Sequence, residues 1–225
     1  MSDTTFAIDT AGAYVTKLAA DGQPILFTRQ RIGDKLRGGS HVCLPNFGPD
    51  VSGELAQHGF GRVVDWKLTK DEPNIKELTL PSIAGVYTGL QATLRYDCSE
   101  SGMLMRLTVV NTGRQPLRVA PAFHPYFAVP DESDVQLNGE LLDLSTYAGT
   151  EYIKGTRQTL QVGERTLTLH SDELTTWALW TDQAAGYFCV EPSLRGQSFR
   201  RSEPDTEELL QPDEQRTYDF RISWS

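Results

Sequence analysis

The 225-residue sequence has few cysteines, and their spacing excludes the common cysteine-based sites. Cys43, Cys98 and Cys189 lie far apart and form no Cys-x-x-Cys pair, so neither a zinc knuckle nor a thioredoxin-like motif is indicated. An odd number of distant cysteines is typical of free, buried thiols in a reducing compartment. We therefore expect a cytoplasmic protein.

Positive charge is also scarce. The chain carries 21 Lys and Arg against 30 Asp and Glu, which gives a formal net charge of -9. Nucleic acids and anionic membranes are bound through clustered basic residues, so neither is expected as a partner. The sequence has no apolar run long enough to span a membrane. Its first residues, MSDTTFAIDT, lack the basic and apolar regions of a signal peptide.

Sustained helical periodicity is missing as well, and a period of two takes its place. Apolar residues alternate with polar ones in YDFRISW (218–224), MLMRLTV (103–109), GLQATLRY (89–96) and RTLTLH (165–170). Such alternation predicts half-buried strands, and the Asn-Gly pair in LNGEL (137–141) predicts a tight hairpin. We expect an all-β fold in which residues 1–225 form a single domain, a large antiparallel β-sandwich.

One stretch does not alternate. Residues 37–62 are rich in Gly, Pro and small polar side chains. A long irregular segment inside a compact β domain is usually functional. Arg37 and Arg62, at its two ends, would ordinarily be surface charges, but the glycines beside them indicate close approach of the backbone to a neighbour. We therefore expect ordered loops that cross one face of the sandwich.

Two ionisable residues occur where an apolar strand pattern breaks or ends. Glu191 follows the apolar run 187–190, and a carboxylate at the end of a buried strand must be paired, hydrogen-bonded or functional. Burial would raise its pKa toward the range of a general base. His124 lies among the aromatic residues of AFHPYFAV (122–129), where it is either a core histidine or a proton donor.

The remaining ionisable residues have simpler interpretations. His41 and His170 are expected to be structural or exposed. Three acidic residues before the last strand are expected to form a solvated stretch: Glu203, Glu207 and Glu208. A metal site formed by His41, His58 and His124 is disfavoured because no His-x-His or His-Glu-x-x-His spacing occurs. The sequence shows no glycine-rich phosphate loop, nucleophile elbow or catalytic-triad order.

Five segments follow one another in an order that a known family shares. They are RGGSHVCLPNFGP, QHGFGRVVDW, VVNTGRQPLRVAPAFHPYF, WTDQAAGYFCVEP and ELLQPDEQRTYDFRISW. Together they resemble the aldose 1-epimerase (galactose mutarotase-like) family. The resemblance implies that family's large β-sandwich and its activity, the interconversion of the α and β anomers of a cyclic sugar. The first two segments are most similar to the glucose-6-phosphate 1-epimerase branch.

The resemblance also implies roles for individual residues. The family's general acid falls on His124 and its general base on Glu191, and no metal or organic cofactor is required. Four residues match or adjoin positions that bind substrate in the family: Arg37, Gln57, His58 and Arg62. The family's sugar-binding Asp, usually in a Thr-Asp-x-x-Tyr motif, has no match. Glu151 in AGTEYIKG is one candidate to replace it, and Asp182 in WTDQ is another.

Three other functions stay open at this point. A carbohydrate-binding domain that has lost catalysis is favoured by the missing Asp motif and by a chain that is shorter than typical members after His124. A glycosidase would use two carboxylates, such as Glu191 with Glu151 or Asp182. A metal-binding β-barrel oxygenase would need a metal ion. For the epimerase, the expected partner is a small-molecule sugar or sugar phosphate, and the protein is expected to be a monomer or a weak homodimer.

Overall fold

The computed structural model describes residues 4–130, 134–147 and 149–225. Ala148 of the AGTEYIKG segment and the first three residues of the N-terminal stretch therefore lie outside the described residues. Its regular structure is β, apart from four one-turn 3₁₀ helices: η1 (Gly85–Tyr87), η2 (Leu144–Thr146), η3 (Ser198–Arg200) and η4 (Thr206–Glu208). Among the described residues, no helix has the length and apolar character needed to cross a membrane.

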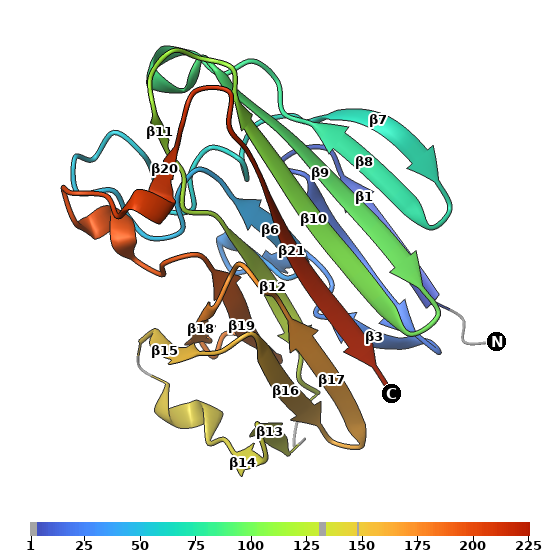
Figure 1. The fold of residues 1–225 in the computed structure, drawn as a ribbon. Coiled ribbons are helices and arrows are strands. Elements are labelled where there is room, and N and C mark those ends of the chain that lie inside the picture. The colour runs from blue at the N-terminus through green and yellow to red at the C-terminus, as the bar shows by residue number, and fades with distance from the viewer. Residues whose placement is uncertain (1–3, 131–133, 148) are drawn as a thin grey trace.

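Two large antiparallel sheets form the sandwich (Figure 1). The eight-stranded sheet contains, in spatial order, β1 (Thr4–Asp9), β2 (Tyr14–Ala20), β3 (Gln23–Leu26), β12 (Ala122–Ala128), β19 (Tyr187–Ser193), β18 (Thr176–Trp180) and β15 (Glu151–Lys154), with β6 (Ser40–Cys43) paired to β12 and β2. The nine-stranded sheet contains β14 (Glu140–Leu141), β13 (Val135–Leu137), β16 (Arg157–Val162), β17 (Arg165–His170), β21 (Gln215–Trp224), β10 (Gly102–Asn111), β9 (Leu90–Ser99), β8 (Ile75–Thr79) and β7 (Lys67–Glu72). Two small ribbons pair β4 (Gln30–Ile32) with β5 (Lys35–Arg37) and β11 (Leu117–Arg118) with β20 (Leu209–Leu210). The predicted all-β, antiparallel fold is confirmed.

The core lies between the two sheets, where the alternating apolar residues meet. In β10 every second side chain is buried, beginning at Met103, and β21 presents Phe220 and Ile222 to the same core. Phe220 contacts Phe123 of the other sheet at a ring-centroid distance of 5.9 Å and Trp177 at 6.0 Å. These contacts fix the two sheets face to face, because close-packed aromatic rings leave no room for either sheet to slide.

The second face of the eight-stranded sheet is also buried, and this face positions the site. Along β12, Phe123 and Phe127 belong to the core, whereas Tyr126 belongs to a separate cluster that also contains Tyr187 and Cys189 of β19. Successive side chains of a strand point to opposite faces. His124 and Glu191 share the parity of that outer cluster and therefore point away from the main core.

The irregular segment after β6 folds back onto β6 itself. The amide of Gly61 donates a hydrogen bond to the carbonyl oxygen of Leu44 (2.9 Å). Gly59 has a φ of +65°, and a Cβ atom there would lie 2.1 Å from the same oxygen. Glycine is required where two backbones approach this closely. The contact places His58 and Arg62, on either side of these glycines, beside the outer face of the sheet.

Candidate active site

A cavity of about 340 Å³ opens on this outer face. It is lined by residues of β5, β12, β15, β18 and β19 and of the loops between strands: Arg37, Phe47, Gly48, Gln57, His58, Arg62, His124, Tyr126, Thr150, Tyr152, Trp180, Glu191 and Gln197. Six of the eight candidate site residues named from the sequence therefore converge on one cavity, and the two alternative carboxylates, Glu151 and Asp182, do not line it. The volume is at the lower end of the range for small-molecule sites, which suits a single sugar ring.

His124 and Glu191 face each other at the bottom of the cavity. The pairing of β12 with β19 joins Ala122 to Ser193 and Tyr126 to Cys189, which sets His124 opposite Glu191. His124 Nε2 lies 3.4 Å from Glu191 Oε2, and the two residues are 5% and 2% exposed. Register, not sequence proximity, brings these groups together across 67 residues of chain.

Burial opposes charge on both members of the pair. It raises the pKa of the Glu191 carboxyl well above its usual range. Burial also lowers the pKa of the His124 imidazole well below its usual value, and the neighbouring His58 and the Arg62 guanidinium lower it further. Burial thus favours a neutral carboxylic acid beside a neutral imidazole.

Two further histidines pack around His124. The ring of His41 is stacked on it at a centroid distance of 4.8 Å, and the ring of His58 stands perpendicular to it at 5.0 Å. His58 Nδ1 lies 3.4 Å from Cys43 Sγ, and burial together with Arg62 lowers the pKa of His58 to about 3. His41 is 2% exposed and neither of its ring nitrogens has a hydrogen-bond partner among the described residues.

The sequence predicted that His41 would be structural or exposed, and the structure makes it a buried residue that stacks on His124 without itself lining the cavity. The residue stands opposite His124 in the pairing of β6 with β12. No local pattern reveals such a contact, because strand order and register are set by the whole sheet.

The two arginines of the cavity differ in their partners. Arg37 Nε and Nη2 contact Asp182 Oδ2 at 2.8 and 2.7 Å, and the Tyr187 hydroxyl also donates to Asp182. Asp182 thus holds Arg37 in place and neutralises its charge. Arg62 is half-buried and has no carboxylate partner within the described part of the chain. It is the uncompensated cation of the cavity.

The candidate for the family's sugar-binding carboxylate does not enter the cavity. Glu151 is exposed at the start of β15, while its neighbours Thr150 and Tyr152 line the wall. The Tyr152 ring packs closely against Gly196, because a Cβ atom added to Gly196 would lie 3.0 Å from the ring. Sequence reasoning missed Thr150, Tyr152 and Gln197, because Thr150 and Gln197 lie in connections and Tyr152 lies on the short strand β15, and the positions of all three depend on the strands around them. Trp180 ends the apolar run 177–180 of strand β18, and that run was a usable strand signal.

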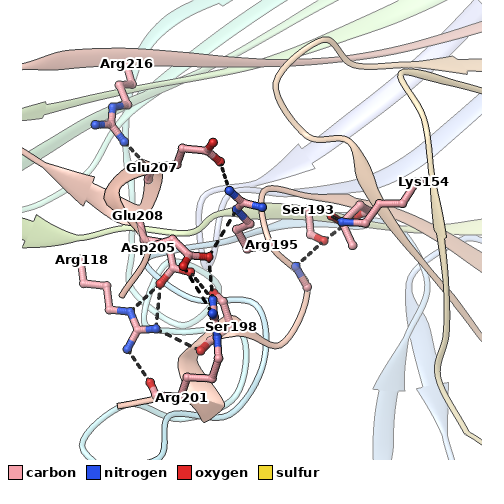
Figure 2. A network of polar contacts seen from close by, with 12 residues as sticks. Arg118, Lys154, Ser193, Arg195, Ser198, Arg201, Asp205, Glu207, Glu208 and Arg216 are labelled. Carbon is pink, nitrogen blue, oxygen red and sulfur yellow. Dashed lines mark hydrogen bonds and ion pairs between the residues drawn. The ribbon is translucent and has the colours of Figure 1, made fainter. Parts of the chain in front are cut away.

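An ion-pair network fixes the loop that brings Gln197 to the cavity (Figure 2). Glu208 is 0% exposed and accepts a hydrogen bond from Arg118 Nε (2.7 Å), and Arg201 Nη2 lies 3.2 Å from its second oxygen. Arg118 also donates to the carbonyl oxygen of Ser198 at 3.0 Å. Because Ser198 follows Gln197 directly, the network holds Gln197 at the cavity wall.

The expectation of a solvated acidic stretch is wrong for Glu208. Glu203 and Glu207 are exposed as predicted, but Glu208 ends the one-turn helix η4 and points inward. Consecutive residues of a 3₁₀ helix project about 120° apart. One turn can therefore place Glu207 in solvent and Glu208 under the loop.

A family model described as aldose 1-epimerase matches residues 3–185. The chain belongs to the aldose 1-epimerase family. The family resemblance drawn from five motifs is thereby confirmed.

Two curated relatives of this aldose 1-epimerase family member carry the name "Putative glucose-6-phosphate 1-epimerase". One, from Cenchrus ciliaris, is 30% identical over 151 residues, which cover 57% of this chain and 45% of the relative. The other, from Salmonella typhimurium, is 31% identical over 117 residues, covering 48% of this chain and 38% of the relative. The matched part thus spans less than half the length of either relative.

Solved structures of similar fold cover the whole family member. The Slr1438 protein from Synechocystis sp. PCC 6803 has a TM-score of 0.81 at 20% identity, over 100% of this chain and 92% of that one. A galactose mutarotase-like protein from Lactobacillus casei has a TM-score of 0.79 at 17% identity, over 99% of this chain and 97% of that one. The fold is therefore the galactose mutarotase-like β-sandwich predicted from the sequence.

Proposed function

We propose that the protein is an aldose 1-epimerase, or mutarotase, that interconverts the α and β anomers of a hexose 6-phosphate by acid–base ring opening. The observation that carries the proposal is the His124–Glu191 pair, which is buried, in contact at 3.4 Å and part of the lining of a sugar-sized cavity. Positioned acid–base groups of this kind contribute about 10²–10⁴-fold to rate.

The pair holds the proton that the reaction needs. A carboxylic acid beside a neutral imidazole carries the same number of protons as a carboxylate beside an imidazolium. Moving one proton from Glu191 to His124 converts the first form into the second. Polar groups of the bound sugar favour the ionised form because they replace part of the solvation that burial removed.

Ring opening then proceeds with Glu191 as base and His124 as acid. Glu191 removes the proton of the C1 hydroxyl, the C1=O bond forms, the C1–O5 bond breaks, and His124 protonates O5. Rotation about C1–C2 presents the other face of the carbonyl. Closure reverses each transfer and returns both residues to their starting state, so protons and electrons balance within the cycle.

The unpaired guanidinium of Arg62 supports a phosphorylated substrate. Asp182 already compensates Arg37, whereas Arg62 faces the cavity without a counter-ion among the described residues. A guanidinium binds phosphate through charge-assisted hydrogen bonds, often two at once. In a hexose 6-phosphate the phosphate group is at the end of the sugar opposite to the reacting C1 atom, so a guanidinium can bind it without entering the reaction.

A two-carboxylate glycosidase is less consistent with this arrangement. Glu191 is the single acidic residue that lines the cavity among the described residues, Glu151 is exposed outside it, and Asp182 is bound to Arg37 and Tyr187. Hydrolysis by the common route needs two carboxyl groups that flank the scissile bond.

The proposal is tested by anomer exchange at equilibrium, measured by NMR with glucose, galactose and glucose 6-phosphate. Wild-type protein should accelerate exchange of at least glucose 6-phosphate, and Glu191→Gln should lower the rate by at least about 10²-fold because the amide cannot take the C1 proton. Folded wild-type protein that accelerates no sugar would overturn the enzyme assignment. Binding without exchange would instead establish a carbohydrate-binding domain.

A second variant tests the phosphate assignment. Arg62→Gln should raise KM for glucose 6-phosphate about 10–100-fold, since hydrogen bonds to charged groups contribute about 1.5–3 kcal/mol. The KM for unphosphorylated glucose should change far less. The matched control is Arg31→Gln, which removes an exposed guanidinium from the β4–β5 ribbon. Equal effects of Arg62→Gln on both sugars would contradict a phosphate role.

A further inference from the structure

A thiol lies beside the acid–base pair, and the proposed reaction has no use for it. Cys189 and Glu191 are two residues apart on β19 and project to the same face, while His124 comes from the paired strand β12. Each of the three residues offers one donor atom: an imidazole nitrogen, a thiol sulfur and a carboxylate oxygen. These three atoms lie within 4.8 Å of one another. All three residues are buried, and Cys189 is 0% exposed.

The polar groups of this cluster lack partners. Glu191 Oε2 and His124 Nδ1 are buried without a hydrogen bond to any described residue. The 3.4 Å approach of His124 Nε2 to Glu191 Oε2 brings the two atoms together without hydrogen-bond geometry. Buried polar atoms without partners are uncommon in folded proteins and call for an explanation.

The separation of the donor atoms matches that of two ligands on one metal ion. Nitrogen and oxygen ligands about 2.0–2.2 Å from a tetrahedral Zn²⁺ lie about 3.4 Å apart. The His124–Glu191 pair already has this spacing. The three donor atoms lie within 4.8 Å of one another, so Cys189 Sγ must close on the pair to reach a zinc–sulfur distance of about 2.3 Å. A fourth ligand position would face the cavity and be filled by water.

We propose that His124, Cys189 and Glu191 form a site for one thiophilic divalent cation, with Zn²⁺ and Cd²⁺ as the fitting ions, and that the bound ion blocks the acid–base pair. A mixed nitrogen, sulfur and oxygen donor set selects zinc-group ions over the hard cations Mg²⁺ and Ca²⁺. The metal site stands on its own geometry, and its inhibitory effect rests on the proposed function.

A second thiol–imidazole pair provides the natural alternative. Cys43 Sγ lies 3.4 Å from His58 Nδ1 in the wall of the same cavity. That pair has no third ligand among the described clusters of potential metal ligands, whereas the Cys189 cluster has three. Replacing each cysteine in turn therefore tells the two locations apart.

The first experiment measures Cd²⁺ binding by the thiolate-to-metal absorption in the ultraviolet, which requires no catalytic activity. Wild-type protein should bind one Cd²⁺ with this band, and Cys189→Ser should lose it. Cys43→Ser and Cys98→Ser should retain it. Cys189→Ala serves as a second variant, and circular dichroism confirms that each variant folds. A wild-type protein without the band, or a band lost in Cys43→Ser but kept in Cys189→Ser, would overturn the site.

The second experiment measures anomer exchange against Zn²⁺ concentration. Cys189→Ser should keep the metal-free rate of exchange, because Cys189 takes no part in the proton transfers. The variant should need at least about tenfold more Zn²⁺ for half-inhibition. That factor corresponds to about 1.4 kcal/mol of lost binding free energy. Identical inhibition of wild type and Cys189→Ser would contradict the assignment. If wild type proves inactive, the Cd²⁺ band still decides the metal site, so the two proposals fail separately.

Discussion

Glu191 and Glu208 are equally withdrawn from solvent, at 2% and 0% exposed, but their surroundings are opposite. Glu208 is bound by the guanidinium groups of Arg118 and Arg201 in the network of Figure 2. Glu191 Oε2 has no hydrogen-bond donor among the described residues and faces a cavity. Burial is therefore not by itself a sign of function. What distinguishes the structural carboxylate from the reactive one is whether cationic side chains are paired with it.

The difference follows from the cost of burying a charge. A buried carboxylate that is fully paired can remain ionised, and it then orders the segments that supply its partners. A buried carboxylate without partners stays protonated at higher pH, which makes it available for proton transfer. The same substitution, glutamate to glutamine, should accordingly have opposite effects on stability at the two positions.

The largest effect is expected at the paired residue. Glu208→Gln should lower the free energy of unfolding by about 3–5 kcal/mol, because removing one partner leaves the Arg118 charge buried and uncompensated. Urea denaturation measures the loss. Glu207→Gln, which breaks an exposed pair with Arg195, is the matched control and should cost less than about 1 kcal/mol. Equal losses for both would remove the distinction between the two glutamates.

Glu191→Gln should instead leave the protein as stable as wild type, or more stable by about 1 kcal/mol near neutral pH. Burial raises the pKa of Glu191, so the folded state holds a proton that the unfolded state releases above its ordinary pKa. Wild-type stability therefore falls as pH rises through that range. Glutamine is neutral in both states, so its advantage should widen between about pH 4 and pH 7. An advantage that does not depend on pH would contradict this origin.

The last effect concerns the slope of stability against pH and the histidines, whose pKa values are shifted in the opposite direction. Burial lowers the pKa of His58 to about 3 and that of His41 well below its ordinary value. The unfolded state therefore binds more protons as pH falls below about 6.5, and stability declines. His58→Asn should reduce the slope by up to about 1.4 kcal/mol per pH unit.

The substitution suits its position because His58 has a φ of 67°, which asparagine tolerates. Denaturant midpoints measured from about pH 7 to pH 4.5 provide the slope of stability against pH. Glu191 and His124 share the cavity and are present in both proteins, so the difference between the two slopes reports on His58. Phe47→Leu is the control, since it alters the contact with the His58 ring without removing a proton site. An unchanged slope in His58→Asn would show that this histidine is not held neutral by the fold.

Local patterns predicted much of the architecture. Alternation identified β9, β10, β17 and β21, and the Asn-Gly pair forms the β13–β14 hairpin, where Asn138 and Gly139 both have positive φ. These features are local because side-chain direction and turn conformation depend on a few adjacent residues. The motifs likewise selected six residues that line one cavity, together with Glu151, which does not.

The strands, their buried faces and the chemical types gathered around the candidate site follow from local sequence patterns. Which of these groups meet depends on how the sheets pair and pack. Register set His124 against Glu191 and stacked His41 on His124. A single helical turn separated buried Glu208 from exposed Glu207. The physical reason is that a charge's environment depends on residues distant in the chain, and strand order and loop packing bring those residues into place only when the whole sandwich forms.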